Sequence, residues 1–414
     1  MACDSESHPN PELARLIKDR RASVRSTTVQ LLGEFEDEWA VDLLIAALRD
    51  RSDEVRRQAA IQLKRLKNPK AIFPLYKLWA DPGRRHKVLK EALDAVEEVG
   101  RNSLDYLEEA IRGDDLDRVH SAVKVLSVVW GRRAIQLLLD AVHHTDPWVA
   151  INVAYSLNRH DDAYALESLL TKLDSSELHV RTNAALVLSF VGEGRAFPTL
   201  VAALGSEDWS LRMRGAMGLG KLRDPRGVAH LLGALSDEHG QVKRTAVWSL
   251  CSMIDEVDLD DVVPPLVNAC LYDPDPEFSL YARAIVGLFP REELMSRLIG
   301  ALQSDEKLDA RVNAAETLGY LRDPGAVEPL IRVLQHDPLP RLRKATAEAL
   351  EWIRDRRAAE PLKAAARDED PGVRTAARRA WVACTAKQPR RGRPRVGRTA
   401  GPCGVAEQTT LGLQ

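Results

Sequence analysis

The chain has 414 residues, of which 45% are apolar, 29% charged and only 5% aromatic, an ordinary soluble composition with few large core side chains. Its 59 basic and 61 acidic side chains nearly cancel, which excludes both a polyanion and a protein that binds nucleic acid through bulk charge. No apolar run approaches the roughly 20 residues that span a bilayer, and the polar, acidic N-terminus is unlike a signal peptide. We therefore expect a cytoplasmic protein with reduced thiols at five widely separated positions: Cys3, Cys251, Cys270, Cys384 and Cys403.

After a predicted flexible segment at residues 1–11, one phrase recurs along the chain. An apolar anchor, usually followed by Arg or Lys, precedes small residues four and five positions on and Leu at position eight. The anchors are 30 to 33 residues apart, except for one interval of 38, and they are Val24, Val55, Val88, Val119, Val149, Val180, Leu211, Val242, Leu280, Ala310, Leu342 and Val373. Positions 0, 4, 8 and 11 share one helical face, so each phrase predicts an amphipathic helix.

Between these phrases lies a second apolar segment, such as residues 41–45, 197–200 and 327–330, which predicts a second helix in every repeat. Pro is tolerated there because it falls in the first helical turn. Two helices in about 31 residues cannot bury their apolar faces alone, so neighbouring pairs must stack. The sequence therefore predicts an all-α fold, an α-solenoid of about twelve antiparallel helix pairs over residues 12–386.

The phrase is clearest at Val180, where Arg181, Ala184, Ala185 and Leu188 complete it, and the second helix opens as Ala-Val-x-Pro-Leu at Ala326. Together with the period, these phrases resemble the HEAT-like repeats first named from phycobilisome (PBS) lyases. The resemblance covers about residues 12 to 384. It implies an armadillo-like helical fold but no single function, because such repeats serve lyases, hydroxylases and plain scaffolds.

The basic residue after each anchor has two interpretations. A row of arginines is a candidate phosphate-binding surface, but in repeats of this type it commonly pairs with an acid of an adjacent repeat. Asp53, Asp208 and Asp370 are nearby candidates for such pairing, which favours a structural role. The arginines in question are Arg25, Arg56, Arg181, Arg212, Arg343 and Arg374.

Positions 2, 6 and 9 point away from the predicted core, toward what is expected to be the concave surface of the solenoid. In the middle of the chain these positions are apolar, which predicts a partner-binding strip: Ile151, Tyr155, Leu186, Met213, Met217, Trp248, Val286 and Phe289. Basic residues are expected along its edges: Arg159, Arg214, Lys221, Arg244 and Arg283. Such a surface suits an amphipathic acidic helix or an elongated carboxylate ligand. The alternative is that position 6 packs laterally against the next repeat.

The 38-residue interval contains an acidic insert at residues 255–261. It predicts a longer entry into the following helix, and no metal site is expected because no Gly occupies a calcium-loop position.

Beyond residue 386 the period stops, and residues 387–414 are predicted to be a disordered basic tail with six basic residues against Glu407. The remaining 386 residues then carry a net charge of -7, since the whole chain has -2 and the tail +5. Arg391, Gly392, Arg393 and Pro394 resemble the core of an AT-hook, which implies weak, salt-dependent contact with DNA. A generic basic tail is the alternative.

No catalytic motif stands out. Bilin lyases are built from similar repeats, and deoxyhypusine hydroxylases bind iron through four His-Glu dipeptides, of which this chain has none. The pair His143 and His144 beside Trp148 is the densest histidine group. We expect a non-enzymatic scaffold that binds a protein partner, without metal or cofactor. The alternatives are a lyase-like or hydroxylase-like enzyme, or a scaffold tethered to DNA by its tail.

Overall fold

The computed structural model describes residues 10–81, 83, 86–160, 162–287, 291–304 and 307–386. All regular structure among these residues is helical, which confirms the predicted all-α class and the α-solenoid. None of the helices in this part of the chain is long and apolar enough to cross a membrane. The chain divides into two compact units, residues 1–199 and 200–414, which are described separately.

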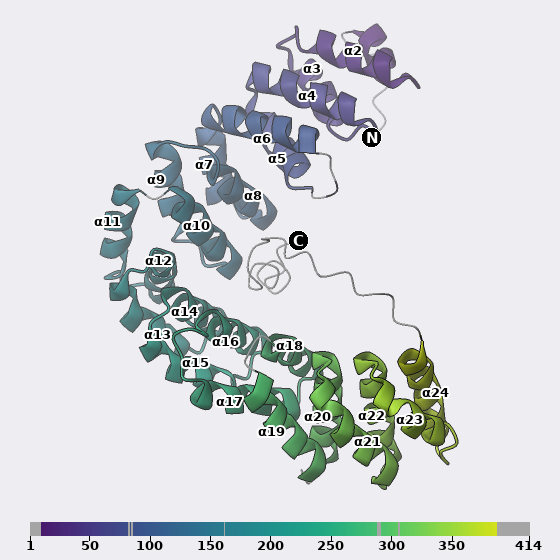
Figure 1. The fold of residues 1–414 in the computed structure, drawn as a ribbon. Coiled ribbons are helices and arrows are strands. Elements are labelled where there is room, and N and C mark those ends of the chain that lie inside the picture. The colour runs from purple at the N-terminus through teal and green to yellow at the C-terminus, as the bar shows by residue number, and fades with distance from the viewer. Residues whose placement is uncertain are drawn as a thin grey trace. The chain divides into compact units, whose positions relative to one another are not determined.

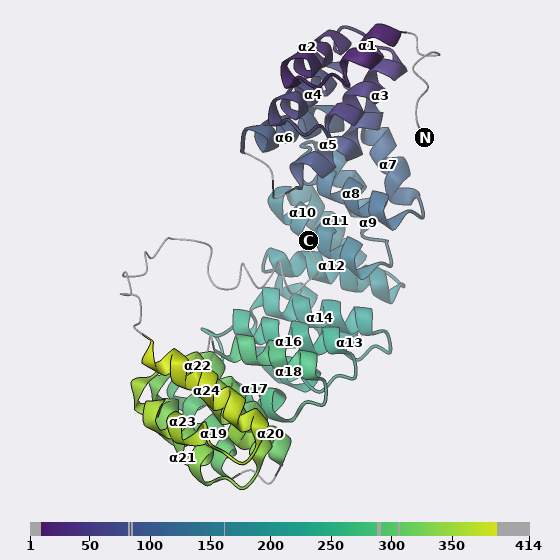
Figure 2. The ribbon, with the colours of Figure 1, turned by 90° about the vertical axis from the view of Figure 1, so that its right-hand side faces the viewer.

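Unit 1 consists of helices in two rows. The first helices of its repeats are α1 (Pro11–Leu16), α3 (Glu38–Ala47), α5 (Ile72–Trp79), α7 (Leu104–Arg112), α9 (Arg132–Ala141) and α11 (Ala163–Lys172). The second helices are α2 (Ala22–Leu32), α4 (Asp53–Leu66), α6 (His86–Arg101), α8 (Leu116–Leu126), α10 (Pro147–His160) and α12 (Leu178–Phe190). Figure 2 shows α2, α4 and α6 on one side of this unit and α1, α3 and α7 on the other.

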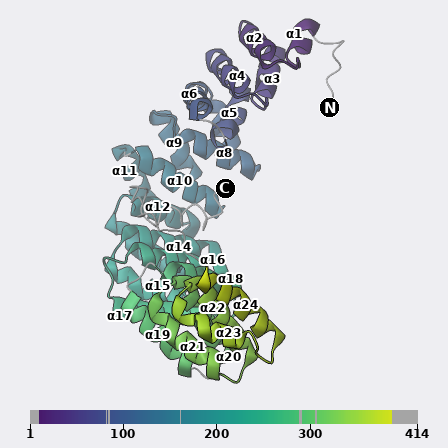
Figure 3. The ribbon, with the colours of Figure 1, turned by 45° about the vertical axis from the view of Figure 1, so that its right-hand side comes forward.

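Unit 2 repeats the same plan after α13 (Phe197–Leu204), the helix within which the division falls. Its further first helices are α15 (Val228–Ala234), α17 (Leu259–Tyr272), α19 (Arg291–Ser304), α21 (Val327–His336) and α23 (Ala359–Ala365). The second helices are α14 (Trp209–Leu222), α16 (Gly240–Ser252), α18 (Pro276–Val286), α20 (Leu308–Leu321), α22 (Pro340–Ile353) and α24 (Pro371–Thr385). In Figures 1 and 3, α14, α16 and α18 form one row and α15, α17 and α19 the other.

Every one of the twelve predicted anchors lies in a second helix of a repeat. Ten of them are buried, with Val24 half-buried at the first repeat. Short 3₁₀ turns introduce five of the first helices: η1 (Pro69–Ala71), η2 (Gly194–Ala196), η3 (Pro225–Gly227), η4 (Pro324–Ala326) and η5 (Arg356–Ala358). The periodicity therefore located the helices because each repeat buries the same positions.

Aspartates before several second helices act as caps. Asp146 Oδ1 accepts hydrogen bonds from the backbone N–H groups of Trp148 and Val149, both at 2.9 Å. Asp370 accepts from the Val373 N–H at 2.9 Å. These bonds satisfy N–H groups that have no partner within the helix, with Pro preset for its first turn.

The acidic insert at residues 255–261 forms the longer helix entry that the sequence predicts. Asp258 caps α17 by accepting from the Asp260 N–H at 3.0 Å. Glu256, earlier in the insert, accepts from Arg223 Nε at 2.8 Å. Two acidic side chains of the insert therefore form a helix cap and an ion pair with Arg223.

Small residues allow neighbouring second helices to approach closely. A Cβ added to Gly220 of α14 would lie 2.4 Å from the Ser249 Cβ of α16. One added to Gly319 of α20 would lie 2.6 Å from the Ala349 Cα of α22. Glycine is required at both positions because the adjacent backbone occupies the space of a side chain.

The three described cysteines, Cys251, Cys270 and Cys384, are free and buried. Burial raises the pKa of the Cys270 thiol to about 12 and that of Cys384 to about 11. In a Cys3→Ser/Cys403→Ser variant we therefore expect no thiol to react with Ellman's reagent at pH 8 while the protein is folded, because the thiolate is the reactive form. Unfolding in urea should release three reactive thiols. Rapid stoichiometric labelling of the folded variant would contradict this burial.

Candidate functional site

The arginines after the helix anchors interlock successive repeats. In the first repeat, Arg25 Nε donates to Asp50 Oδ2 at 2.7 Å, and its Nη2 donates to Asp50 Oδ1 at 2.8 Å. Its Nη1 donates to the backbone carbonyls of Asp19 and Arg20 at 2.8 and 3.1 Å. One guanidinium thus bonds both the loop before its own helix and the loop before the next second helix.

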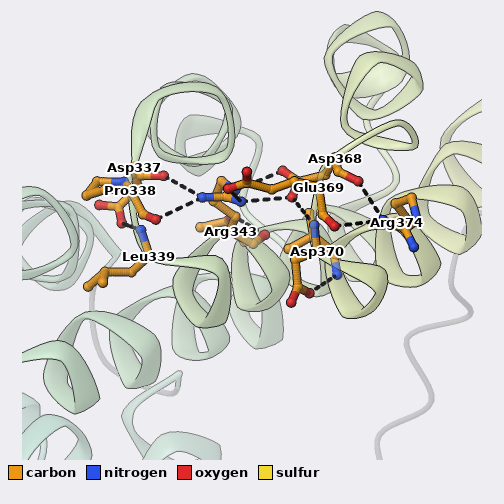
Figure 4. Close-up of polar contacts among 10 residues, drawn as sticks. Asp337, Pro338, Leu339, Arg343, Asp368, Glu369, Asp370 and Arg374 are labelled. Atoms are coloured by element: carbon orange, nitrogen blue, oxygen red, sulfur yellow. Dashed lines mark hydrogen bonds and ion pairs between the residues drawn. The ribbon is translucent and has the colours of Figure 1, made fainter.

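Unit 2 has the same geometry twice, each time between an arginine and an aspartate 25 residues further along the chain. Arg212 Nε and Nη2 bond the two carboxylate oxygens of Asp237 at 2.7 and 3.0 Å. Arg343 bonds those of Asp368 at 2.9 and 2.8 Å (Figure 4). This hydrogen bonding lowers the pKa of the Asp368 carboxyl. We call these contacts the Arg–Asp ladder; related rungs are Lys243–Asp273 and Arg311–Asp337.

The ladder confirms the structural role predicted for Arg25, Arg212 and Arg343 and corrects their partners. Among the described residues, Arg181 and Arg374 bond only backbone carbonyls. Asp208 and Asp370 are helix caps; Asp208, for example, accepts from the Ser210 N–H at 2.8 Å. Asp53 contacts Arg56 of its own helix. Asp50 and Asp368 lie three and two residues before the predicted Asp53 and Asp370, and Asp237 lies about one repeat after the predicted Asp208. Loop geometry decides which carboxylate faces the guanidinium.

The prediction that the apolar strip is exposed to solvent is wrong. Tyr155 is half-buried, with its ring edge-on to Phe190 at 4.9 Å. Phe289 lies outside the described residues. The other six members are at most 6% exposed: Ile151, Leu186, Met213, Met217, Trp248 and Val286. Their assignment to partner binding stays a prediction that these side chains are poorly placed to fulfil.

Lateral packing explains this burial. Within unit 1, α10 packs against α8 and α12, and within unit 2, α16 packs against α14 and α18, so position 6 of these helices fills the space between neighbours instead of facing solvent. In unit 2, Lys221 of α14 lies over the indole of Trp248 in α16, with Nζ 4.7 Å from the ring centroid. The alternative of lateral packing is therefore correct for these residues.

The residues predicted to form the basic edge differ in their exposure to solvent. Arg159 is exposed, whereas Lys221 and Arg244 are half-buried. Arg214 is only 1% exposed and bonds Ser210 in the preceding helical turn. Arg283 is 6% exposed and lines a cavity.

This cavity, of about 750 Å³, lies in unit 2 between the end of α17, α18 and the N-terminal parts of α20 and α22. We call it the Arg283 cavity. Its polar lining includes Ser279, Arg283, Lys307, Asn313, Glu316 and Arg341.

Arg283 makes an incomplete set of hydrogen bonds in this cavity. Its Nη1 donates to Glu316 Oε2 at 2.6 Å, and its Nη2 lies 3.4 Å from Asn313 Oδ1. Its Nε is buried without an acceptor. Asn313 in turn donates to the Leu271 carbonyl at 3.0 Å, which fixes the amide against α17.

A row of exposed apolar side chains, not foreseen from the sequence, follows the C-terminal ends of three consecutive second helices. Tyr320 of α20, Trp352 of α22 and Val382 of α24 are 46%, 43% and 59% exposed. We call it the α20–α24 row. These residues are 32 and 30 positions apart, so the repeat period itself was a signal that could have found them.

The histidine group near Trp148 makes contacts within unit 1. Lys172 Nζ lies 2.7 Å from His143 Nε2, and the Asp146 N–H donates to His144 Nδ1 at 3.0 Å. Burial lowers the pKa of His143, and Lys172 adds to this effect. Across the described residues, no three His, Cys, Asp or Glu side chains are arranged to hold a metal ion. The AT-hook-like residues 391–394 lie outside the described residues.

Comparison with known proteins finds HEAT repeats over residues 10–86, 41–127, 135–208, 166–251, 197–285 and 295–381. A solved structure concerning Kap95p binding to RanGDP is 15% identical with a TM-score of 0.54, covering 90% of this chain and 55% of that one, so the chain spans about half its length. The Kap95:Nup1 complex is 14% identical, with 90% and 55% covered and a TM-score of 0.45. Human deoxyhypusine hydroxylase is 20% identical, with 69% and 97% covered and a TM-score of 0.26. No curated protein matches the sequence.

Proposed function

Because the chain belongs to the HEAT repeat family, we propose that it is a scaffold that binds a protein partner. The α20–α24 row carries this proposal. Three apolar side chains stay exposed near the ends of successive second helices, Tyr320 and Trp352 ten positions after their anchors and Val382 nine, and exposed apolar residues of this kind mark surfaces that partners cover. Aromatic side chains such as Trp352 and Tyr320 contribute strongly to such interfaces. Kap95p, which shares the fold, binds RanGDP, and this supports a protein as the kind of ligand.

Further parts of the proposal rest on the sequence. The lack of clustered cysteines favours a cytoplasmic protein. The PBS-lyase type of repeat is supported by the phrase at Val180. Lyase-like or hydroxylase-like activity and DNA contact through residues 391–394 stay alternatives, since no contact among the described residues favours them over partner binding.

The test compares Trp352→Asp with the matched change Leu116→Asp. Leu116 lies on α8, and its side chain is 45% exposed, close to the 43% of Trp352. Trp352→Asp should release a specific partner in affinity capture, and the purified partner should then bind this variant at least about 30-fold more weakly, as expected for an aromatic hot spot. Leu116→Asp should bind like the wild type.

Circular dichroism and thermal unfolding must show that both variants fold. Retention of every captured protein by folded Trp352→Asp would contradict the proposal. Asp substitutions at Met217 or Trp248 do not serve this purpose, because both side chains are buried and the variants would report on folding.

A further inference from the structure

The Arg–Asp ladder shows how a buried arginine is satisfied in this fold. Arg25, Arg212 and Arg343 each direct the edge formed by Nε and Nη2 at a single aspartate, with all six N···O distances between 2.7 and 3.0 Å. This two-pronged contact is the geometry in which guanidinium and carboxylate match best.

One second helix in unit 2 departs from the ladder. In α18 the position after the anchor is occupied by Tyr281, and the arginine comes two residues later, at Arg283. This guanidinium is buried like those of the ladder, but its Nε has no acceptor and its Nη2 has only the long 3.4 Å contact with Asn313. Glu316 bonds the other amino group, Nη1. The Nε and Nη2 edge therefore lacks the carboxylate found in the three complete rungs.

The cost of this arrangement points to a ligand. A buried N–H without an acceptor destabilises a fold, because it has lost its hydrogen bond to water and gained none in the protein. Arg283 lines a cavity of about 750 Å³, large enough to admit a side chain from another molecule. Nε is shielded from solvent in this structure, so a ligand reaches it only if the guanidinium turns its Nε and Nη2 edge toward the cavity.

We propose that the Arg283 cavity binds a carboxylate side chain from an acidic segment of the partner protein, held by Nε and Nη2 of Arg283. The proposal rests on the proposed function for the origin of the carboxylate. In the bound state Nη2 gives up its long contact with Asn313, while Nη1 keeps Glu316 and the Asn313 amide keeps the Leu271 carbonyl. Lys307 and Arg341 add positive charge to the cavity wall.

A carboxylate fits this cavity better than a phosphate group. Glu316, Asp309 and Asp273 also belong to the wall, and a dianion would be repelled by them more strongly than a single carboxylate. Asp273 and Asp309 are already paired with Lys243 and Arg341, at 2.7 and 2.6 Å. One guanidinium edge therefore remains for one monovalent anion.

The probe is glutarate, with the uncharged glutaramide as its matched control and inorganic phosphate as the competing chemistry. Protein labelled with ¹⁵N in arginine reports each Nε–H group by NMR, and the Arg283 signal is the one missing from Arg283→Lys. This variant keeps the positive charge beside Glu316 but lacks the two-pronged edge. Arg332→Lys, an exposed arginine on α21, is the control substitution.

We expect glutarate to shift the Arg283 Nε–H signal saturably at millimolar concentration, with no shift from glutaramide and none at the ladder residue Arg343. Arg332→Lys should leave this response unchanged. If the Arg283 Nε–H signal does not move when glutarate is added, the proposal is overturned. So does a stronger response to phosphate, which would assign the cavity to another class of anion.

Failure of this inference is separable from failure of the scaffold proposal. With a partner identified through Trp352, Arg283→Lys should weaken its binding at least tenfold while thermal unfolding stays close to that of the wild type. If Trp352→Asp abolishes binding and Arg283→Lys does not change it, the scaffold stands and the cavity assignment is wrong. If no partner depends on Trp352, the scaffold proposal and the partner origin of the carboxylate fall, whatever glutarate shows.

Discussion

Replacing Arg343 by Met should lower the free energy of unfolding of unit 2 by about 3 to 5 kcal/mol, the range typical of a buried ion pair that loses one partner. Arg343 is 7% exposed, and its removal leaves the Asp368 carboxylate without its two-pronged bond in a site that is largely closed to water. It also frees the carbonyls of Asp337 and Pro338, which accept from Nη1 (Figure 4). Urea unfolding followed by circular dichroism measures the change.

The matched control is Arg379→Met, which breaks an exposed ion pair with Glu351 in unit 2. Exposed pairs contribute between about 0 and 1 kcal/mol, so the control should unfold nearly as the wild type does. Equal destabilisation by the two variants would show that the ladder has no special role in stability.

The effect of Arg343→Met should depend on pH in a definite direction. The Arg343 hydrogen bond lowers the pKa of Asp368 in the folded protein, so this contribution to stability is complete above the unfolded value of about 4 and is lost as the pH falls through the folded value. The difference in unfolding free energy between wild type and variant should therefore narrow below about pH 4. A constant difference from pH 7 to pH 3 would contradict the assignment.

Gly319→Ala should destabilise unit 2 by about 1 to 3 kcal/mol, although alanine normally favours a helix over glycine by about 1 kcal/mol. The added Cβ would lie 2.6 Å from the Ala349 Cα and 3.1 Å from Trp352 Cε3. Backbone cannot yield as a flexible side chain does, so α20 and α22 must separate. Because Trp352 belongs to the α20–α24 row, partner binding should weaken as well.

Gly300→Ala provides the opposite expectation within the same unit. Gly300 lies in α19, and a Cβ at this position meets nothing within 4 Å. The substitution should stabilise the protein by about 0.5 to 1 kcal/mol through helix propensity and reduced freedom of the unfolded chain. Thermal unfolding of the two variants side by side tests whether close helix approach, and not glycine itself, sets the result.

The helix positions could be predicted because the chain can be compared with itself. Anchors such as Val55 and Val373 recur where each repeat buries the same face, and one structural unit explains all of them. The ladder partners could not be assigned in this way. Asp50 lies in the short loop before α4 and Asp53 is the first residue of that helix, and only the turn between them decides that Asp50 faces Arg25 while Asp53 faces Arg56.

The predicted strip failed for a different physical reason. An amphipathic pattern identifies the core face of a helix that has solvent on its other side, but Leu186 and Met217 lie in helices enclosed by neighbours in both rows. Position 6 is polar at both ends of the chain, at Gln30 and Arg379, and apolar in the central repeats from Val125 to Val286. That gradient follows burial. Arg283 does have a sequence signal, since Tyr281 stands where most other repeats have a basic residue after the anchor, but the missing acceptor at Nε is visible only in the structure.

The 25-residue step of the Arg–Asp ladder has a consequence for how such a chain can change in length. Arg343 finds its aspartate within one period, 25 residues further on, so a tandem duplication of residues 343–373 would copy both Arg343 and Asp368 and leave each copy correctly joined. An insertion of arbitrary length inside that interval would instead shift the acceptor out of register. The Arg–Asp ladder therefore favours changes in chain length by whole repeats and disfavours insertions of only part of a repeat.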